Sequence, residues 1–269
     1  MVAFPPSKIN LGLNVLSKRK DGFHDLETCF YPVPWTDIIE VIPANEFSFT
    51  SSGNVIPGKI EENLCVKAYD LLKRDFDISP VKIHLHKIVP VGAGLGGGSS
   101  DAAYTLRLIN QVLNLQLPNE KLKGYASQVG SDCSFFIQDH AMLGIGKGEI
   151  IEQIEVNLKG YWIVVVKPAI HISTRQAYTD VIPKIPAIKI KEIVQQPMNT
   201  WGGLLKNDFE ESIFRKHGEI KEIKKQFELQ GALYTSMSGS GSAVYALFEK
   251  PIHLKSFFDG MAYWEGVLL

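Results

Sequence analysis

The sequence predicts an α+β protein built from two lobes. Its 269 residues exceed what one ordinary domain of about 100 to 200 residues requires. Runs of alternating apolar and polar residues are typical of half-buried strands, and apolar residues spaced three or four apart are typical of helices; both occur along the chain. The character of the sequence changes near Lys159, so we expect an N-terminal lobe over residues 1–155 and a C-terminal lobe over residues 156–269.

The first strands are expected at the N-terminus. Apolar residues over 9–15 alternate with polar ones, which is the period of a strand with one buried face, and Lys8 and Asn10 share its polar face. A charged turn with Asp-Gly follows, and apolar residues resume over 26–31 and 38–42. These runs predict a β-meander.

Helices and strands alternate in the rest of the chain. Asn63 is suited to cap a helix through Leu72, and Asn119 opens another through Val129. A strand over 81–85 leads through a glycine-rich turn into a helix from Ser99. The other expected elements are strands and turns over 140–156, a strand over 162–166, helices over 204–214 and 220–229, and a strand over 244–248.

The composition excludes several classes of partner. A net charge of −1, from 28 basic and 29 acidic residues, provides no broad basic surface, so no nucleic-acid partner is expected. The start shows no secretory signal, and the longest apolar run, WIVVV, is far short of the ~20 residues of a membrane helix. Cys29, Cys65 and Cys133 lack CxxC spacing, as expected of reduced thiols. We expect a cytoplasmic protein without a membrane partner.

The segment PVGAGLGGGSSDAA, residues 90–103, predicts a phosphate-binding loop. Its glycines can adopt positive φ near a bulky anion, and the helix start after them offers N–H groups and a positive dipole end. The alternative is a flexible turn, which would not need so many glycines. It is not a P-loop, because Ser99 and Ser100 follow Gly98 where Lys-Ser would be required. A Rossmann loop and a protein kinase are disfavoured, because no suitably placed acidic residue and no HRD or DFG motif follow.

This loop resembles the nucleotide loop of GHMP kinases, and other segments agree with that family. SKINLGLNV, residues 7–15, resembles the first GHMP motif, and SMSGSGSAVYALFE, residues 236–249, resembles the third. Within the superfamily, DGFH and GSDCSFFI most resemble the diphosphocytidyl-methylerythritol kinases. The resemblance implies a two-lobed GHMP kinase fold, with an N-terminal lobe like ribosomal protein S5 domain 2 and a C-terminal lobe of ferredoxin-like type.

The resemblance also implies a nucleotide site. The expected ATP-binding residues are Pro90, Val91, Gly92, Ala93, Gly94, Leu95, Gly96, Gly97, Gly98, Ser99 and Ser100. The two serines could touch phosphate or Mg²⁺, or cap the helix, and no ligand is assigned to the Mg²⁺ that the family implies. His84 and His86 share one face of a strand, but without an evident third ligand a solvated strand face is favoured over a metal site.

Lys8 and Asp132 match the catalytic pair of the family. A carboxylate can accept the proton of a substrate hydroxyl, and a nearby ammonium can keep that carboxylate ionised and stabilise the transferring phosphoryl group. Taken singly, Lys8 could be a solvent-facing strand residue and Asp132 a helix cap. The match of both positions to the family motifs favours catalysis.

Four further residues match the substrate site of the family. Asn10 is expected to hold the methylerythritol part, and Phe23 and His24 to stack on the cytosine and to hydrogen-bond its edge. Tyr178 could supply an opposing aromatic ring. A core phenylalanine and a surface histidine are the alternatives for Phe23 and His24.

The predicted function follows from this resemblance. The chain is expected to transfer a phosphoryl group from ATP, with Mg²⁺, to the 2-hydroxyl of 4-diphosphocytidyl-2-C-methyl-D-erythritol in the non-mevalonate isoprenoid pathway. The partner is a small-molecule substrate, and the protein is expected to be a monomer or homodimer. The alternatives are a GHMP kinase for mevalonate, a sugar or homoserine, and a catalytically idle nucleotide-binding sensor of the same fold.

Overall fold

The computed structural model describes residues 1–138 and 140–269, which form two compact units. Unit 1 comprises Met1–Ser7, Trp35–Val91 and Gly96–His140, and unit 2 comprises Lys8–Pro34, Gly92–Leu95 and Ala141–Leu269. The chain therefore passes between the units several times. The boundary at residue 155 between an N-terminal and a C-terminal lobe stays a prediction.

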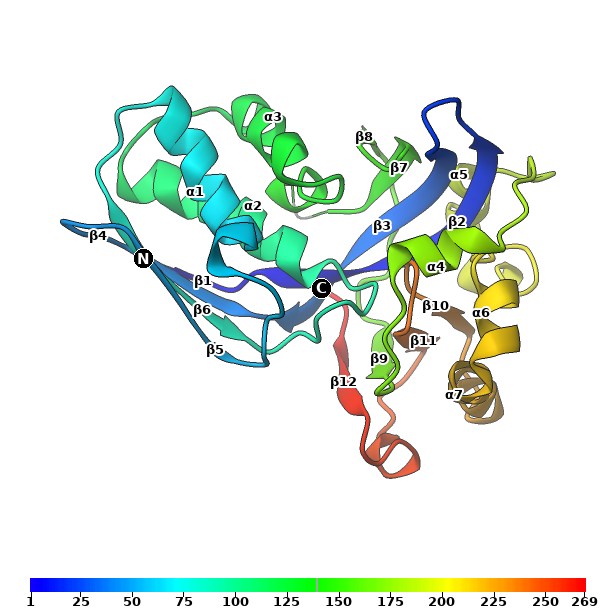
Figure 1. Cartoon of the computed structure of the whole chain (residues 1–269). Coiled ribbons are helices and arrows are strands. Elements are labelled where there is room, and N and C mark those ends of the chain that lie inside the picture. Colours follow the sequence, from blue (N-terminus) through cyan, green and yellow to red (C-terminus); the bar gives the residue numbers. More distant parts are fainter. Residues whose placement is uncertain (139) are drawn as a thin grey trace. The chain divides into compact units, whose positions relative to one another are not determined.

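Unit 1 contains a sheet with helices packed on one face (Figure 1). The strand order is β1-β4-β6-β5, with β4 antiparallel to β1 and β6, and β5 parallel to β6. Val81, Ile83 and Leu85 of β6 are buried and alternate with more exposed residues, so the sheet buries one face. The elements are β1 (Val2–Ala3), β4 (Ile38–Pro43), β5 (Ser48–Gly53), β6 (Val81–Lys87), α1 (Leu64–Asp75), α2 (Gly97–Val112) and α3 (Asn119–Val129).

Most predicted elements of unit 1 are confirmed. α1 starts after Asn63, whose side-chain oxygen accepts the N–H of Cys65 at 2.9 Å, and α3 has the predicted bounds. The strand β5 is missing from the sequence prediction, because SFTSSG lacks alternating apolar residues. Its hydroxyls bond the sheet-face histidines instead, with Thr50 Oγ1 2.8 Å from Nδ1 of His84 and Ser52 Oγ 2.9 Å from Nδ1 of His86.

The predicted β-meander is wrong in its third strand. β4 pairs with β1 and β6, whereas the second predicted strand, β3, belongs to a different sheet. Asp37 lies between β3 and β4, where the chain changes sheet. Its carboxylate accepts the N–H groups of Ile88 and Val89 at 2.6 and 2.8 Å, which ties the start of β4 to the end of β6.

Among the described residues, unit 2 contains two four-stranded sheets, ordered β2-β3-β7-β8 and β10-β11-β9-β12. The first residues of β2 and the last of β3 belong to unit 1. In Figure 1, α6 and α7 lie beside β10 and β11. The elements are β2 (Pro6–Lys18), β3 (His24–Thr36), β7 (Met142–Gly146), β8 (Ile150–Gln153), β9 (Trp162–Lys167), β10 (Tyr234–Met237), β11 (Val244–Phe248), β12 (Ala262–Val267), α4 (Thr174–Thr179), α5 (Ile190–Val194), α6 (Glu210–Lys216) and α7 (Gly218–Leu229).

An apolar core joins the helices of unit 2 to its second sheet. Val164 and Val166 of β9 pack in one cluster with Ile213, Ile223 and Phe227 of α6 and α7. Burial of such side chains, at about 25 cal/mol per Å² of apolar surface, is the main stabilising contribution. The short 3₁₀ turns of the chain are Ile60–Glu62, Phe135–Ile137, Met198–Thr200 and Lys255–Phe257.

One predicted helix of unit 2 begins later than expected, at Glu210 and not at Leu204. The residues before it extend along β2, where the Leu13 N–H donates to the Lys206 carbonyl and the Asp208 N–H donates to the Leu13 carbonyl, both at 2.8 Å. This pairing replaces the first helical turns. The predicted strands over 162–166 and 244–248 are confirmed as β9 and β11.

A buried ion cluster connects three elements of unit 1. The Lys87 ammonium, at the end of β6, donates to Asp37 and, at 2.7 Å, to Oδ2 of Asp101 in α2. All three side chains are at most 3% exposed, and Asp101 Oδ1 has no hydrogen-bond partner within the described chain. Burial, together with the Asp37 charge, raises the pKa of Asp101 to about 7, although Lys87 opposes this shift.

The Asp101→Asn variant should change how stability depends on pH. Because the folded-state pKa of Asp101 lies above the unfolded-state value, the native protein retains a proton that the unfolded chain releases between about pH 4 and 7. The free energy of unfolding of the wild type should therefore fall, relative to the variant, by up to about 1.4 kcal/mol per pH unit across this window.

Urea unfolding at a series of pH values measures this difference. The Asp77→Asn variant, which replaces an exposed carboxylate, is the control for the loss of one negative charge. Parallel stability curves for the wild type and Asp101→Asn would contradict the assignment of a buried, proton-binding carboxyl group.

Candidate active site

Lys8 lies on β2 with its ammonium group enclosed by polar partners. The residue is 3% exposed, and its Nζ donates to Asn10 Oδ1 at 2.6 Å and to the Gly94 carbonyl at 3.0 Å. The ring of Phe30 lies 5.3 Å from Nζ, within the range of a cation–π contact. The predicted catalytic lysine is thus a buried cation directed at the glycine-rich loop, and the solvent-facing alternative for Lys8 is wrong.

The first part of the glycine-rich loop interlocks with the third motif inside unit 2. The Ser238 hydroxyl donates to the Gly94 carbonyl at 2.8 Å, and the Ala243 N–H donates to the Ala93 carbonyl at 3.1 Å. Gly94 has φ of +77°, and a Cβ there would lie 2.0 Å from the Ser238 carbonyl oxygen. Only glycine allows this close approach of the two backbones.

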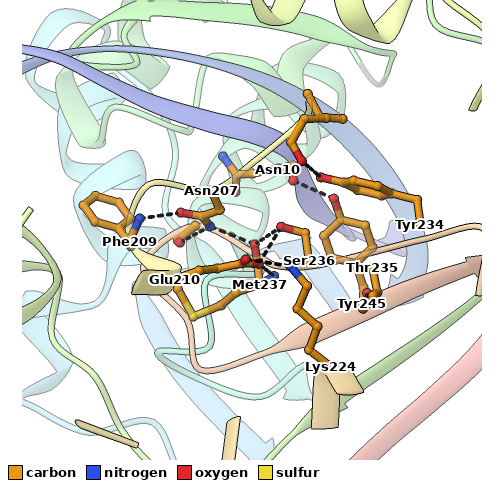
Figure 2. A network of polar contacts seen from close by, with 12 residues as sticks. Asn10, Asn207, Phe209, Glu210, Lys224, Tyr234, Thr235, Ser236, Met237 and Tyr245 are labelled. Carbon is orange, nitrogen blue, oxygen red and sulfur yellow. Dashed lines mark hydrogen bonds and ion pairs between the residues drawn. The ribbon is translucent and has the colours of Figure 1, made fainter. Parts of the chain in front are cut away.

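A buried polar network holds the third motif from the other side (Figure 2). Asn207 Nδ2 donates to the carbonyls of Met237 and Gly239, each at 2.8 Å. Glu210 Oε1 accepts the Met237 N–H at 2.7 Å, while its Oε2 accepts from the Lys224 ammonium at 2.6 Å. Asn207 and Glu210 belong to the segment KNDFE, residues 206–210. This segment therefore holds the backbone that lies against Gly94.

The second part of the glycine-rich loop starts α2 in unit 1. α2 begins at Gly97, earlier than the predicted Ser99, so the serines lie in its first turn. Ser100 is 0% exposed, and within residues 1–138 and 140–269 its hydroxyl has no hydrogen-bond partner. A buried hydroxyl without a partner costs about 1 to 3 kcal/mol, and a phosphate oxygen or a bound cation would remove that cost. The helix start therefore fits the phosphate groups of a nucleotide.

Asp132 lies in unit 1, in the turn after α3. It is half-buried, and the Ser131 hydroxyl donates to its Oδ1 at 3.4 Å. Its neighbour Cys133 is 0% exposed, and burial raises the pKa of the Cys133 thiol to about 12. This agrees with the interpretation of Cys133 as a core residue and not a nucleophile. Because Lys8 and Asp132 belong to different units, their pairing stays a prediction.

Two of the predicted substrate residues lie together in unit 2. The rings of His24 and Tyr178 are stacked with centroids 4.7 Å apart, and Tyr178 also packs edge-on against Phe209. Burial is the main reason that the pKa of His24 is lowered, and the Lys18 charge adds to it. His24 therefore stays neutral at pH 7, with one ring nitrogen as donor and the other as acceptor.

Phe23 is exposed, whereas Asn10 is buried. Phe23 is 58% exposed, with Lys147 Nζ 4.9 Å from the centroid of its ring, so the core-phenylalanine alternative is wrong. Asn10 is 2% exposed, and both ends of its amide contact protein atoms. Their roles toward a substrate stay predictions.

The structure adds residues that the sequence patterns do not indicate. The Thr28 hydroxyl on β3 accepts a hydrogen bond from Asn10, and the Ser238 hydroxyl donates one to the Gly94 carbonyl. Thr28 is a polar residue inside an apolar strand, which is a weak signal. Ser238 lies in the third motif, but the motif alone does not show which of its serines points toward the glycine-rich loop.

Two absences hold for the described part of the chain. No group of three or more His, Cys, Asp or Glu residues there could hold a metal ion. No helix of these residues has the length and apolar character needed to cross a bilayer.

Comparisons with known proteins identify a kinase of the GHMP class. The model of the GHMP kinases N terminal domain matches residues 63–142, and that of the GHMP kinases C terminal domain matches residues 189–263. The chain belongs to the GHMP kinase family.

Several relatives carry a more specific name. The chain is 52% identical to the 4-diphosphocytidyl-2-C-methyl-D-erythritol kinase of Cytophaga hutchinsonii over 92% of both sequences, and 45% identical to that of Parabacteroides distasonis over 100% of both. A solved 4-(cytidine 5'-diphospho)-2C-methyl-D-erythritol kinase, 31% identical, matches with a TM-score of 0.81 over 93% of this chain and 91% of that one. The mevalonate kinase of Methanococcus jannaschii, 16% identical with a TM-score of 0.66 over 92% and 90% of the chains, shares the fold.

The Gly94→Ala variant should be strongly destabilised, because the added Cβ would overlap the Ser238 carbonyl at a backbone angle that favours glycine. We expect a loss of at least about 3 kcal/mol, measured by urea unfolding. Gly124→Ala is the matched control: nothing lies within 4 Å of its added Cβ, and alanine in this helix should gain about 1 kcal/mol. Equal stability of Gly94→Ala and the wild type would contradict the interlock.

Proposed function

We propose that this chain uses ATP to phosphorylate the 2-hydroxyl of 4-diphosphocytidyl-2-C-methyl-D-erythritol, a step of the non-mevalonate isoprenoid pathway. The names of its relatives and its family support the acceptor and the reaction class. The observation that carries the proposal is the buried Lys8 ammonium, bonded at 3.0 Å to a carbonyl of the glycine-rich loop. A fixed cation at a phosphate loop is what phosphoryl transfer requires.

The ATP phosphates are proposed to bind residues 90–100. The first turn of α2 supplies backbone N–H groups and the positive end of the helix dipole. The Ser100 hydroxyl, which has no partner within the described residues, is a further donor for a phosphate oxygen or a ligand for Mg²⁺. When bound, Mg²⁺ would supply charge neutralisation for the phosphates.

Lys8 and Asp132 are proposed as the catalytic pair. Asp132 accepts the proton of the acceptor hydroxyl while the new phosphorus–oxygen bond forms. Lys8 has two of its hydrogens directed at Asn10 and Gly94, so its charge is held in place and stabilises the transferring phosphoryl group with little reorganisation.

The cytosine is proposed to be held by His24 and Tyr178. Their rings are stacked on one another, so Tyr178 holds the imidazole of His24 in one orientation. A neutral His24 can donate to or accept from the edge of the base. Phe23, more than half exposed on the turn before His24, is proposed to stack on the base, and Asn10 to contact the methylerythritol part.

We also propose that the protein is cytoplasmic. Cys29, Cys65 and Cys133 are unpaired and buried, which is usual in the reducing cytoplasm. The monomeric or homodimeric state and the lack of a nucleic-acid partner stay predictions.

A panel of acceptors with coupled detection of ADP tests the function. We expect turnover with 4-diphosphocytidyl-2-C-methyl-D-erythritol, and none comparable with mevalonate, homoserine or galactose. Lys8→Ala and Asp132→Asn should each lower kcat by about 10²-fold or more. Lys82→Ala, a change of an exposed lysine on β6, is the control and should leave kcat unaltered. Full turnover by Lys8→Ala or Asp132→Asn would contradict the proposed catalytic pair. A preference for another acceptor would contradict the proposed substrate.

The His24→Ala variant should lose discrimination between cytidine and uridine forms of the acceptor. Loss of one buried hydrogen bond to the base corresponds to about 10- to 100-fold in the ratio of kcat/KM values. Steady-state kinetics with both substrates measure this ratio. His253→Ala, on the exposed histidine that pairs with Glu265, is the control, and an unchanged ratio in His24→Ala would exclude His24 from base recognition.

A further inference from the structure

The amide of Asn10 makes a hydrogen bond inside the protein at each of its two ends. Its Oδ1 accepts from the Lys8 ammonium at 2.6 Å, and its Nδ2 donates to the Thr28 hydroxyl oxygen at 2.8 Å. Both Asn10 and Thr28 are at most 2% exposed. The direction of this amide therefore decides what Lys8 meets, because an inverted amide would place an NH₂ group against the ammonium and two sets of donors would face each other.

Thr28 determines the direction of the Asn10 amide. The Thr28 hydroxyl donates to the Gly12 carbonyl at 2.6 Å. A hydroxyl carries only one hydrogen, so toward Asn10 it can act only as an acceptor. The Asn10 NH₂ group must then point to Thr28, and the Asn10 oxygen must point to Lys8.

The backbone of β2 carries both Gly12 and Asn10. Gly12 lies within this strand, and its carbonyl accepts from Thr28. The Tyr245 hydroxyl donates to the Asn10 carbonyl at 2.7 Å, as Figure 2 shows, and so holds the backbone of Asn10. The hydrogen bonds thus run from the Gly12 carbonyl through Thr28 and the Asn10 amide to the Lys8 ammonium.

Ser238 lies beside the same group of atoms. Its hydroxyl donates to the Gly94 carbonyl at 2.8 Å, which is also an acceptor of Lys8. Its single hydrogen is used there, so at 3.4 Å from Asn10 Oδ1 it adds no second donor to that oxygen. The direction of the Asn10 amide therefore depends on Thr28 and Lys8.

We propose that Thr28 is a positioning residue of the kinase, which fixes the direction of the Asn10 amide and thereby holds the Lys8 ammonium for phosphoryl transfer. The inference rests on the proposed function, because that function gives Lys8 its catalytic role. It assigns a role to Thr28, a residue that makes no contact with the reacting groups itself, and it gives Asn10 the task of orienting Lys8.

Three variants test the proposal by kinetics. Thr28→Val keeps the shape of the side chain and removes the hydroxyl, and kcat should fall about 10- to 100-fold while KM for ATP and for the acceptor changes less than about threefold. Thr28→Ser keeps the hydroxyl and should restore kcat to within a few-fold of the wild type. Thr235→Val is the matched control: it removes another buried hydroxyl of unit 2, which donates to the Tyr245 carbonyl at 2.8 Å, and kcat should not change.

Two outcomes of the kinetics would overturn the proposal. One is a kcat of Thr28→Val equal to that of the wild type, and the other is a loss in Thr28→Ser as large as that in Thr28→Val. In a Lys8→Ala background, Thr28→Val should have no further effect on kcat, because both changes act through one group. An unchanged fold-loss in that background would also contradict a role through Lys8.

Crystal structures of Thr28→Val and Thr28→Ser give a readout besides activity. In Thr28→Val the Asn10 amide should rotate and Lys8 Nζ should leave the Gly94 carbonyl, whereas Thr28→Ser should retain both contacts. An unmoved Lys8 in Thr28→Val would overturn the inference. If the wild type turns over no acceptor, the proposed function fails, and the crystal structures still decide whether Thr28 positions Lys8. Thr28→Ala replaces the valine variant if the latter does not accumulate as folded protein.

Discussion

The close contact of two glycine-containing turns is the constraint on which the organisation of unit 2 depends. The Gly94 backbone lies so near the Ser238 carbonyl that a side chain at Gly94 would overlap it. The same contact gives Lys8 one of its acceptors, the Gly94 carbonyl. On the far side, Asn207 and Glu210 hold the backbone of Met237 through buried hydrogen bonds. A phosphate loop is intrinsically mobile because of its glycines, and here a neighbouring segment supplies the rigidity that its own side chains cannot.

This arrangement separates two tasks within one short loop. The backbone carbonyls of residues 93–95 accept from protein donors, while α2 begins at Gly97 and presents N–H groups in its first turn. Carbonyls and N–H groups have opposite polarity, so the first half suits a cation such as the Lys8 ammonium and the second half suits an anion. In the proposed complex, Lys8 and the phosphates would therefore contact different atoms of the same segment.

Much of this could be predicted from the sequence. The period-two pattern around Lys8 correctly predicts β2 and the common face of Lys8 and Asn10, but the prediction that only one face of this strand is buried is wrong, because both faces are buried. The capping residue Asn63 correctly predicts α1. The glycine-rich segment correctly predicts positive φ angles followed by a helix start, because both have a local chemical signature, and its binding of phosphate stays a prediction. The weakly patterned β5 and the displaced start of α6 are missed, because hydrogen bonds with distant strands decide both. Thr28 and Ser238 are missed for a similar reason, since their partners lie far away in the sequence.

The interleaved course of the chain has a practical consequence. Unit 2 is assembled from Lys8–Pro34, Gly92–Leu95 and Ala141–Leu269, and unit 1 takes the segments between them. No cut at a single peptide bond can release either unit whole, so fragments of this protein would each lack strands that their own sheets need. The separate contributions of the two units to binding must therefore be measured by point substitutions in the intact chain, because truncation would remove parts of both.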